Sequence, residues 1–161
     1  MAYDIPGRSG TALASDTIRQ LATIDQVRAV KDAKGDFFEA TKLMDETGLL
    51  WYSGDDVVNL AWLALGAVGV VSVVGHVAGN EFRAMIDAVD AGDLATARAI
   101  HTKLIPAIDA LMNTSQGAIM VKAALKEQGV IDSDAIRLPL LPADEAMYAV
   151  LRDGLTKAGL L

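Results

Sequence analysis

The residue that could do chemistry most directly is Lys31, which ends a short apolar run and is followed by Asp-Ala-Lys-Gly. A lysine at the inner end of a strand is partly desolvated, and desolvation favours the neutral form of an amine. A neutral lysine amine is the nucleophile that forms a Schiff base with a carbonyl compound. The alternative is that Lys31 extends from the strand end to solvent and has no chemical role.

Tyr3 and Arg8 add a phenol and a guanidinium on either side of a Pro-Gly turn. A tyrosine hydroxyl can relay a proton, and an arginine can bind a carboxylate through two parallel N–H groups. Together with Lys31 they suggest an aldolase-type reaction on a 2-oxo acid. Taken singly, Tyr3 could equally be a core phenol and Arg8 a charge on a surface loop.

Four apolar runs predict the strands that would position these groups, and each is followed by a helical pattern. The expected strands are residues 2–5, 27–31, 49–52 and 69–74, and the expected helices are residues 15–23, 36–46, 57–65 and 80–91. Continuous apolar strands that alternate with helices are typical of a parallel sheet buried on both faces. Such βα units build a doubly wound sheet or a (β/α)8 barrel. No Gly-x-Gly-x-x-Gly follows a strand, so a nucleotide-binding version is not supported.

Polar residues are expected at the carboxyl edge of this sheet, where parallel βα folds carry their active sites. Tyr3, Lys31, the Ser-Gly-Asp of residues 53–55 and Ser72 fall on four successive expected strands. Asp55 and Asp56 precede a helical pattern, so we interpret this pair as a helix cap rather than as catalytic carboxylates.

After residue 91 no further strand is expected, and three helices are predicted at residues 93–112, 116–128 and 143–158. Pro106 is expected to kink the first of them. We therefore expect an α/β organisation with a half-barrel at residues 1–91 and a helical segment at residues 92–161. The helices could support subunit contacts or simply pack on the barrel.

Composition excludes several classes of function. The net charge of -7 argues against nucleic acid or an anionic membrane surface as a partner. There is no cysteine, and His76 and His101 are far apart with no carboxylate at ligand spacing, so we expect no metal and no cofactor. The uncharged residues 57–80 are long enough to cross a bilayer, but glycines and a change of pattern predict a buried helix and strand instead. Without a secretory signal, a cytoplasmic protein is expected.

Several segments resemble successive motifs of the dihydrodipicolinate synthase family, which are pyruvate-dependent class I aldolases with a TIM-barrel fold. They are residues 3–10 (YDIPGRSG), 30–33 (VKDA), 52–56 (YSGDD) and 69–73 (GVVSV). Residues 122–125, 137–139 and 157–161 resemble the helical tail of the family. The resemblance covers essentially the whole chain, in order. It implies half of a TIM (β/α)8 barrel, namely βα units five to eight, followed by C-terminal helices.

The resemblance also implies a role for each site residue. Lys31 would form the Schiff base with pyruvate, and Tyr3 would relay protons to and from the imine and enamine. Arg8 would bind the carboxylate of aspartate semialdehyde at the mouth of the site. Gly54 and Val71 would line the substrate pocket, the latter through its carbonyl. The reaction would be the aldol condensation that serves lysine and diaminopimelate biosynthesis.

The family barrel has eight strands, whereas this chain supplies four βα units. The resemblance implies that the chain lacks the family's Gly-Thr-Thr-Gly-Glu motif, a relay threonine, the tyrosine exchanged between subunits and most of the lysine-feedback site. Four parallel strands alone leave two open edges and an exposed apolar face. We therefore expect a homo-oligomer or a pairing with a complementary N-terminal half, and weak or no activity of the isolated chain.

Two other hypotheses remain open on the sequence alone. A sugar-acid aldolase such as N-acetylneuraminate lyase shares the lysine and the tyrosine, although Arg8 favours the synthase. A half-barrel could also serve as an assembly module without turnover, in which case Lys31 would be inert.

Overall fold

The computed structural model describes all residues, 1–161, and divides into two compact units, Met1–Val71 and Ser72–Leu161. The first unit holds the sheet, and the second contains only helices. The expected division between residues 91 and 92 stays a prediction.

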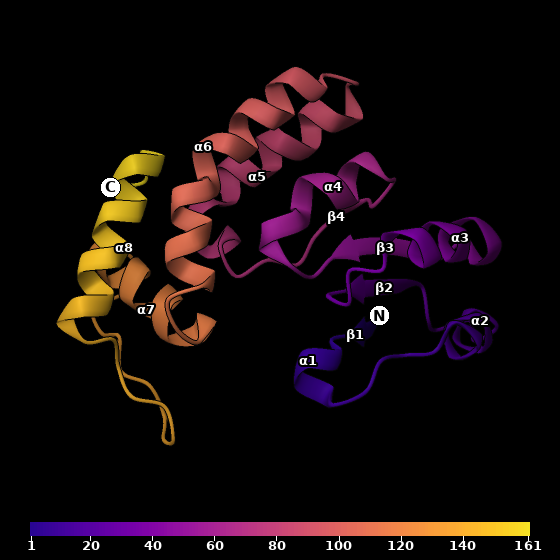
Figure 1. Cartoon of the computed structure of the whole chain (residues 1–161), viewed down its shortest axis with the longest axis horizontal. Coiled ribbons are helices and arrows are strands. Elements are labelled where there is room, and N and C mark those ends of the chain that lie inside the picture. Colours follow the sequence, from indigo (N-terminus) through magenta and orange to yellow (C-terminus); the bar gives the residue numbers. More distant parts are fainter. The chain divides into compact units, whose positions relative to one another are not determined.

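The first unit is built of βα units around one parallel sheet (Figure 1). Its elements are β1 (Ala2–Asp4), α1 (Pro6–Ser9), α2 (Ser15–Ala22), β2 (Ala29–Asp32), α3 (Phe37–Thr47), β3 (Leu50–Ser53), the 3₁₀ turn η1 (Asp56–Val58), α4 (Asn59–Ala64) and β4 (Gly69–Val70). The strands pair in the order β1-β2-β3-β4, and every pair is parallel. The expected four parallel βα strands are therefore present.

The helices of this unit cover one face of the sheet. Val30 of β2 and Trp51 of β3 are buried on that face in a core cluster shared with α2, α3 and α4. The sequence predicts α3 well because both of its ends carry their usual residues. The Asp36 carboxylate accepts the Glu39 N–H at 3.1 Å, and Gly48 ends the helix with φ +65°.

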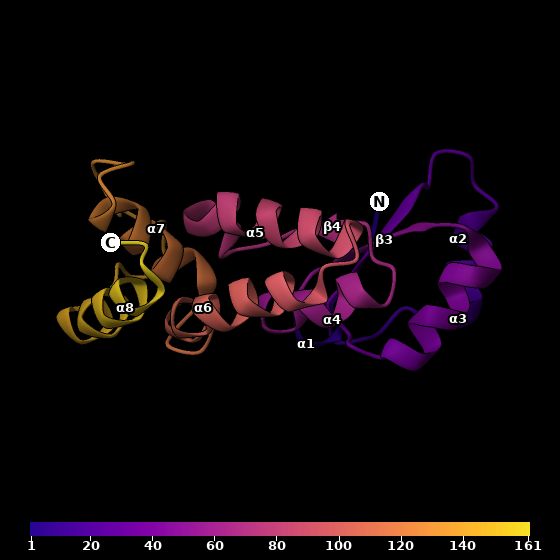
Figure 2. The ribbon, with the colours of Figure 1, turned by 90° about the horizontal axis from the view of Figure 1, so that it is seen from above.

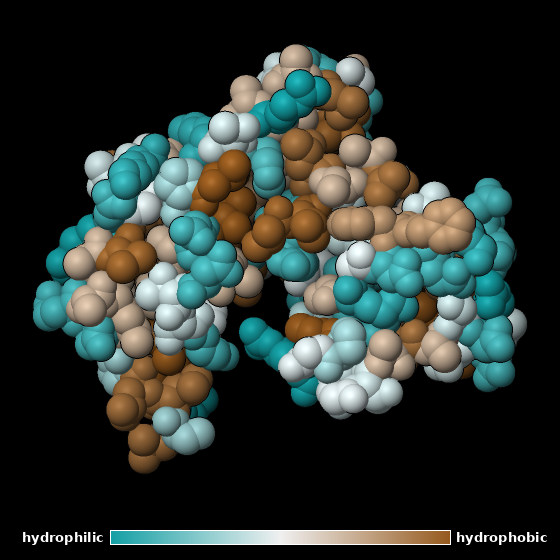
Figure 3. Space-filling view, viewed as in Figure 1, coloured by the Kyte–Doolittle hydropathy of each residue, from teal (hydrophilic) through white to brown (hydrophobic).

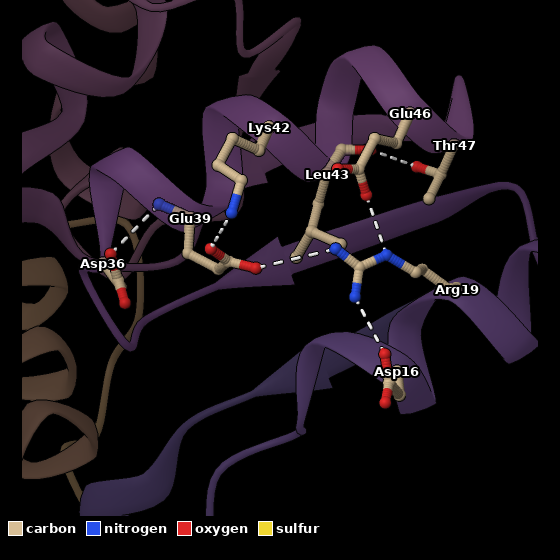
Figure 4. Close-up of polar contacts among 8 residues, drawn as sticks. All are labelled: Asp16, Arg19, Asp36, Glu39, Lys42, Leu43, Glu46 and Thr47. Carbon is tan, nitrogen blue, oxygen red and sulfur yellow. Dashed lines mark hydrogen bonds and ion pairs between the residues drawn. The ribbon is translucent and has the colours of Figure 1, made fainter.

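Arg19 joins α2 to α3 on the outside of this unit (Figure 4). Its guanidinium lies 2.9 Å from Asp16 on its own helix, and 2.7 Å from Glu46 and 3.8 Å from Glu39 on α3. These exposed ion pairs orient the two helices but add little stability, because water screens them.

The second unit is a helical assembly. Its helices are α5 (Gly75–Asp90), α6 (Leu94–Met112), α7 (Gly117–Glu127) and α8 (Glu145–Ala158). Helices α5 and α6 lie side by side in both ribbon views (Figures 1 and 2). Helix α6 also packs closely against α8, where Gly154 faces Pro106 and Ala110. No helix of the chain is long and apolar enough to cross a membrane.

The segment between α7 and α8 carries apolar side chains into solvent, visible as the brown tip at the lower left of Figure 3. Leu138 is 81% exposed and Leu141 67% exposed. The peptide bond between Leu138 and Pro139 is cis.

The structure differs from the sequence-based expectations at several element ends. The fourth strand is only Gly69–Val70, and Ser72 lies beyond it, where its hydroxyl accepts the Gly75 N–H at 2.6 Å. The side chain of Ser72 thus stabilises the turn into α5, a local bond that competes with strand pairing. Helix α5 starts at Gly75 rather than at residue 80, and Ala78 breaks its regular backbone with φ −134° and ψ 35°.

Two helix starts also differ. Ser15 is the first residue of α2 and makes no capping bond, because the N-cap is Ala14. The expected helix at residues 57–65 divides into η1 and α4, since Asp55 caps the 3₁₀ turn first.

Candidate active site

The site residues Tyr3 and Lys31 lie side by side on neighbouring strands. The parallel register pairs Tyr3 with Lys31 and Lys31 with Tyr52, and Tyr52 with Gly69. Because side chains alternate along a strand, these positions share one face of the sheet, opposite the face that α2 and α3 cover. A phenol, an amine and a second phenol thus form a row across β1, β2 and β3.

The amine of Lys31 lies over the ring of Tyr3, with Nζ 4.0 Å from the ring centroid. Lys31 is half-buried, and Tyr3 is 44% exposed, so Tyr3 is not a core phenol. A lysine nitrogen next to a tyrosine on an accessible face is an arrangement in which the amine can attack a carbonyl and the phenol can exchange a proton. Sequence reasoning named both residues, and the strand register brings them together.

Gly54 follows β3 and lies against the stem of Lys31. Its N–H donates to the Asp32 carbonyl at 2.7 Å, which ties the end of β3 to the end of β2. A Cβ atom at Gly54 would stand 2.9 Å from both Cγ and Cε of Lys31. Of the three predicted pocket-lining and binding positions, this is the one in contact with the lysine.

Arg8 and Val71 lie at the ends of the outer strands. Arg8 is exposed in the last turn of α1, just after β1, and its guanidinium has no ion-pair partner. Val71 follows β4, where its N–H donates to the Ser53 carbonyl at 2.8 Å. The Val71 side chain is apolar and the Arg8 guanidinium carries the same charge as the Lys31 ammonium, so neither can bond to Lys31. The roles of Arg8 and Val71 as substrate ligands stay predictions.

The polar residues at 53–56 serve the turn after β3. Ser53 is fully buried, and its hydroxyl donates to the Asp55 carbonyl at 3.1 Å. The Asp55 carboxylate accepts the Val57 N–H at 3.2 Å and caps η1. The interpretation of this pair as a cap is therefore confirmed for Asp55, whereas Asp56 is the first residue of η1 and its buried carboxylate accepts the Asn59 side-chain N–H at 2.9 Å.

A buried carboxylate network lies on the helix-covered face, directly behind the lysine. Asp32 accepts the N–H groups of Lys34 and Gly35 at 2.8 and 3.1 Å and the indole N–H of Trp51 at 3.2 Å. Asp4 accepts the Leu13 N–H at 3.0 Å and lies 3.5 Å from the Lys34 ammonium. Burial raises the pKa of Asp32 above its usual value, against the lowering effect of these N–H donors.

Sequence reasoning missed this network. One part of it has a local signal in the sequence. Asp32 lies two residues before Lys34 and three before Gly35, and an aspartate at this spacing commonly accepts backbone N–H groups and closes a turn. The contact of Asp32 with Trp51 could not be read from the sequence, since the two residues are 19 positions apart.

A metal site or a second pocket that could hold a ligand would indicate a different kind of site. The structure has no group of three or more histidine or acidic side chains that could hold a metal ion. A pocket of about 210 Å³ lies between α6 and α8. Two of its lining residues, Asp153 and Lys157, already form an ion pair at 2.7 Å.

Comparison with known proteins identifies the family. The profile of the dihydrodipicolinate synthetase family matches residues 1–158. The chain belongs to this family. Its match runs through β1, β2 and β3, the strands that carry the row of Tyr3, Lys31 and Tyr52.

Individual relatives agree with the family match. The chain is 53% identical over 160 residues to the 4-hydroxy-tetrahydrodipicolinate synthase of Kineococcus radiotolerans, a match that covers 99% of this chain and 52% of the relative. It is 48% identical over 159 residues to the synthase of Corynebacterium aurimucosum, covering 99% of this chain and 52% of the relative. The chain thus spans about half the length of these relatives.

Solved structures of the family have the same fold. The dihydrodipicolinate synthase of Acinetobacter baumannii, solved in complex with pyruvate, superposes with a TM-score of 0.91 at 35% identity. The match covers 99% of this chain and 55% of that one. The expected fold class, half of the family's TIM barrel with C-terminal helices, is confirmed.

Proposed function

We propose that this chain carries the Schiff-base part of a 4-hydroxy-tetrahydrodipicolinate synthase, in its C-terminal half. In the proposed reaction the Lys31 amine attacks the ketone of pyruvate, water leaves and an imine forms. Loss of a proton from the methyl group gives an enamine, whose carbon attacks the aldehyde of aspartate semialdehyde. Tyr3 carries protons in these steps, Arg8 binds the second substrate's carboxylate, and Gly54 and Val71 line the pocket.

The observation that carries this proposal is the pairing of Lys31 with Tyr3 on one accessible sheet face, with Nζ 4.0 Å from the ring centroid. The amine is the nucleophile that imine formation requires, and the neighbouring phenol is a group able to move its protons. The pyruvate complex of the Acinetobacter baumannii relative supports pyruvate as the first substrate. The synthase names of the relatives support aspartate semialdehyde over a sugar acid.

Association with a second polypeptide chain is part of the same proposal. The chain would work as a homo-oligomer or with a complementary N-terminal half, and alone it would turn over weakly or not at all. Imine formation is therefore a better test than turnover, because it needs only the lysine and its immediate surroundings. The cytoplasmic location expected from the sequence stays a prediction.

The test is reductive trapping. The chain is incubated with pyruvate and borohydride, which converts an imine into a stable secondary amine, and the labelled peptide is identified by mass spectrometry. We expect the adduct on Lys31. Lys34 is the matched internal control, because it lies three residues away but pairs with Asp4 at 3.5 Å.

Two variants complete the design. Lys31→Arg keeps the positive charge but cannot form the imine, so it should remove the adduct, whereas Lys34→Arg should keep it. Tyr3→Phe keeps the ring next to the amine but removes the hydroxyl, and trapping should slow by about 10²-fold or more. Equal labelling of all lysines, or labelling that survives Lys31→Arg, would overturn the proposal.

A further inference from the structure

Lys31 occupies a restricted place on its strand. It lies on β2 between β1 and β3, and its amine lies over the ring of Tyr3 on one side. The stem of the lysine runs toward the carboxyl end of the sheet, where it meets the backbone of Gly54. A strand side chain has several staggered rotamers available, and the one that Lys31 adopts needs free space beside Gly54.

This space comes from the absence of a side chain at residue 54. A Cβ atom there would stand 2.9 Å from Cγ and 2.9 Å from Cε of Lys31, and 3.0 Å from the Asp32 carbonyl oxygen. Ordinary contacts between carbon atoms are about 3.5–4.0 Å, so the lysine stem fills the space that any other residue would need. Two contacts on alternate methylene groups mean that the stem lies flat along the glycine.

The backbone of Gly54 cannot retreat to make room. Its N–H donates to the Asp32 carbonyl at 2.7 Å, and on the next residue Asp55 caps η1. Asp32 is itself fixed by three N–H donors on the covered face. A Cβ atom added at residue 54 would therefore strike the lysine stem, which can turn aside, and the Asp32 carbonyl oxygen, which cannot.

We propose that Gly54 is a positioning residue for Lys31: its missing side chain leaves room for the lysine stem beside the backbone that follows β3, so that the amine lies over Tyr3. This goes beyond a lining role for Gly54, and its catalytic meaning rests on the proposed Schiff-base function. Gly54→Ala should displace the amine from the ring, and the crowded Asp32 carbonyl should lower stability as well.

The test follows the lysine without requiring pyruvate. Lysine amines are reductively methylated with ¹³C-formaldehyde, which keeps their charge, and the Lys31 methyl signal is assigned by its loss in Lys31→Arg. The Tyr3 ring should shift this signal upfield, and Tyr3→Leu should abolish the shift. We expect Gly54→Ala to abolish it as well.

Gly69→Ala is the matched control. Gly69 shares the same sheet face, and its added Cβ would crowd the Tyr52 ring at 3.1 Å instead of the lysine. This variant should leave the Lys31 signal in place. An unchanged signal in Gly54→Ala, or the same loss in Gly69→Ala, would overturn the proposal.

Trapping with pyruvate then separates the two proposals. If both hold, Gly54→Ala should slow Lys31 labelling by about 10- to 100-fold, because a small misplacement of a reacting group costs this much. Gly69→Ala should stay within about 2-fold of the parent chain, since the reacting amine is not moved. The parent chain could show the ring-shifted Lys31 signal, and Gly54→Ala could abolish the shift, while pyruvate labels neither chain. That outcome would support the positioning role of Gly54 and refute the Schiff-base function.

A stability cycle covers the case in which Gly54→Ala folds poorly. Lys31→Ala removes the stem that the new Cβ would strike. Gly54→Ala should then lower the urea midpoint of the parent chain more than that of the Lys31→Ala chain. Equal effects in the two backgrounds would contradict a contact between Gly54 and the lysine.

Discussion

At the scale of single residues, Lys31 and Asp32 are neighbours in sequence with opposite surroundings. Strand alternation directs Lys31 to the accessible face and Asp32 to the face covered by helices. Asp32 is 2% exposed and holds the turn after β2 through two backbone N–H groups. The strand end that presents the lysine is therefore held in place from behind by a buried carboxylate.

We predict a pH-dependent contribution of Asp32 to stability. Burial raises its pKa above the usual 3.8, so the folded chain holds this proton more tightly than the unfolded chain. The stabilisation is present below the usual pKa and is lost as the pH rises through the raised one. The unfolding free energy of the parent chain minus that of Asp32→Asn should therefore fall as the pH rises from below 3.8 through the raised pKa of Asp32.

Urea unfolding at a series of pH values measures this difference. Asp32→Asn also loses the bond from the Trp51 indole, which should cost about 1–3 kcal/mol at every pH. Asp36→Asn is the control, because Asp36 is an exposed helix cap and asparagine caps a helix equally well. A difference that stays constant across the pH range would contradict the prediction.

At the scale of elements, the close packing of α6 on α8 depends on one glycine. A Cβ atom at Gly154 would stand 2.6 Å from the Ala110 side chain and 2.6 Å from the Pro106 carbonyl oxygen. Pro106 has no N–H to continue the helical ladder, yet α6 runs through it from Leu94 to Met112. The packing against α8 therefore supports α6 at its weakest turn.

We predict that Gly154→Ala destabilises the chain by about 1–3 kcal/mol, because the overpacked contact meets backbone that cannot move aside. The urea midpoint measures this loss. Gly79→Ala in α5 is the matched control, since no atom lies within 4 Å of the added Cβ. It should be neutral or stabilising by up to about 1 kcal/mol, and a Gly154→Ala chain that matches it would refute the prediction.

At the scale of the whole molecule, one face of the sheet is not covered by helices. β1 and β4 are edge strands, and the face that carries Lys31 leaves Tyr3, Leu50 and Val71 between 39% and 48% exposed. Open parallel edges and apolar side chains on one face favour association with another sheet. On the covered face, by contrast, Val30 and Trp51 are buried against α2, α3 and α4.

We predict that the chain associates through this face, and static light scattering should give a mass above that of the monomer. Leu50→Lys places a charge on the accessible face and should shift the distribution toward the monomer. Phe38→Lys is the control, because Phe38 is 80% exposed on α3 and lies outside the sheet. A parent chain that is monomeric at all concentrations would contradict the prediction.

The sequence by itself determined the βα alternation and the identity of the lysine. Periodicity and caps are local properties, so the aspartate before α3 and the glycine after it marked that helix nearly to the residue. The apolar run and the turn that follows marked β2 and Lys31 in the same way. Ser72 was placed wrongly within a strand, because the β-branched residues around it predict a strand through residue 74, whereas the strand ends at Val70 and the Ser72 hydroxyl accepts the Gly75 N–H.

Only the tertiary structure decided which of these groups meet. Tyr3 reaches Lys31 through the register of β1 with β2, and Asp32 reaches Trp51 through the pairing of β2 with β3. The role of Gly54 depends on distances of 2.9–3.0 Å from an added Cβ atom to Lys31 and Asp32, which lie more than 20 residues earlier in the chain. Register and close packing arise from all the strands and helices together, so no local pattern in the sequence encodes them.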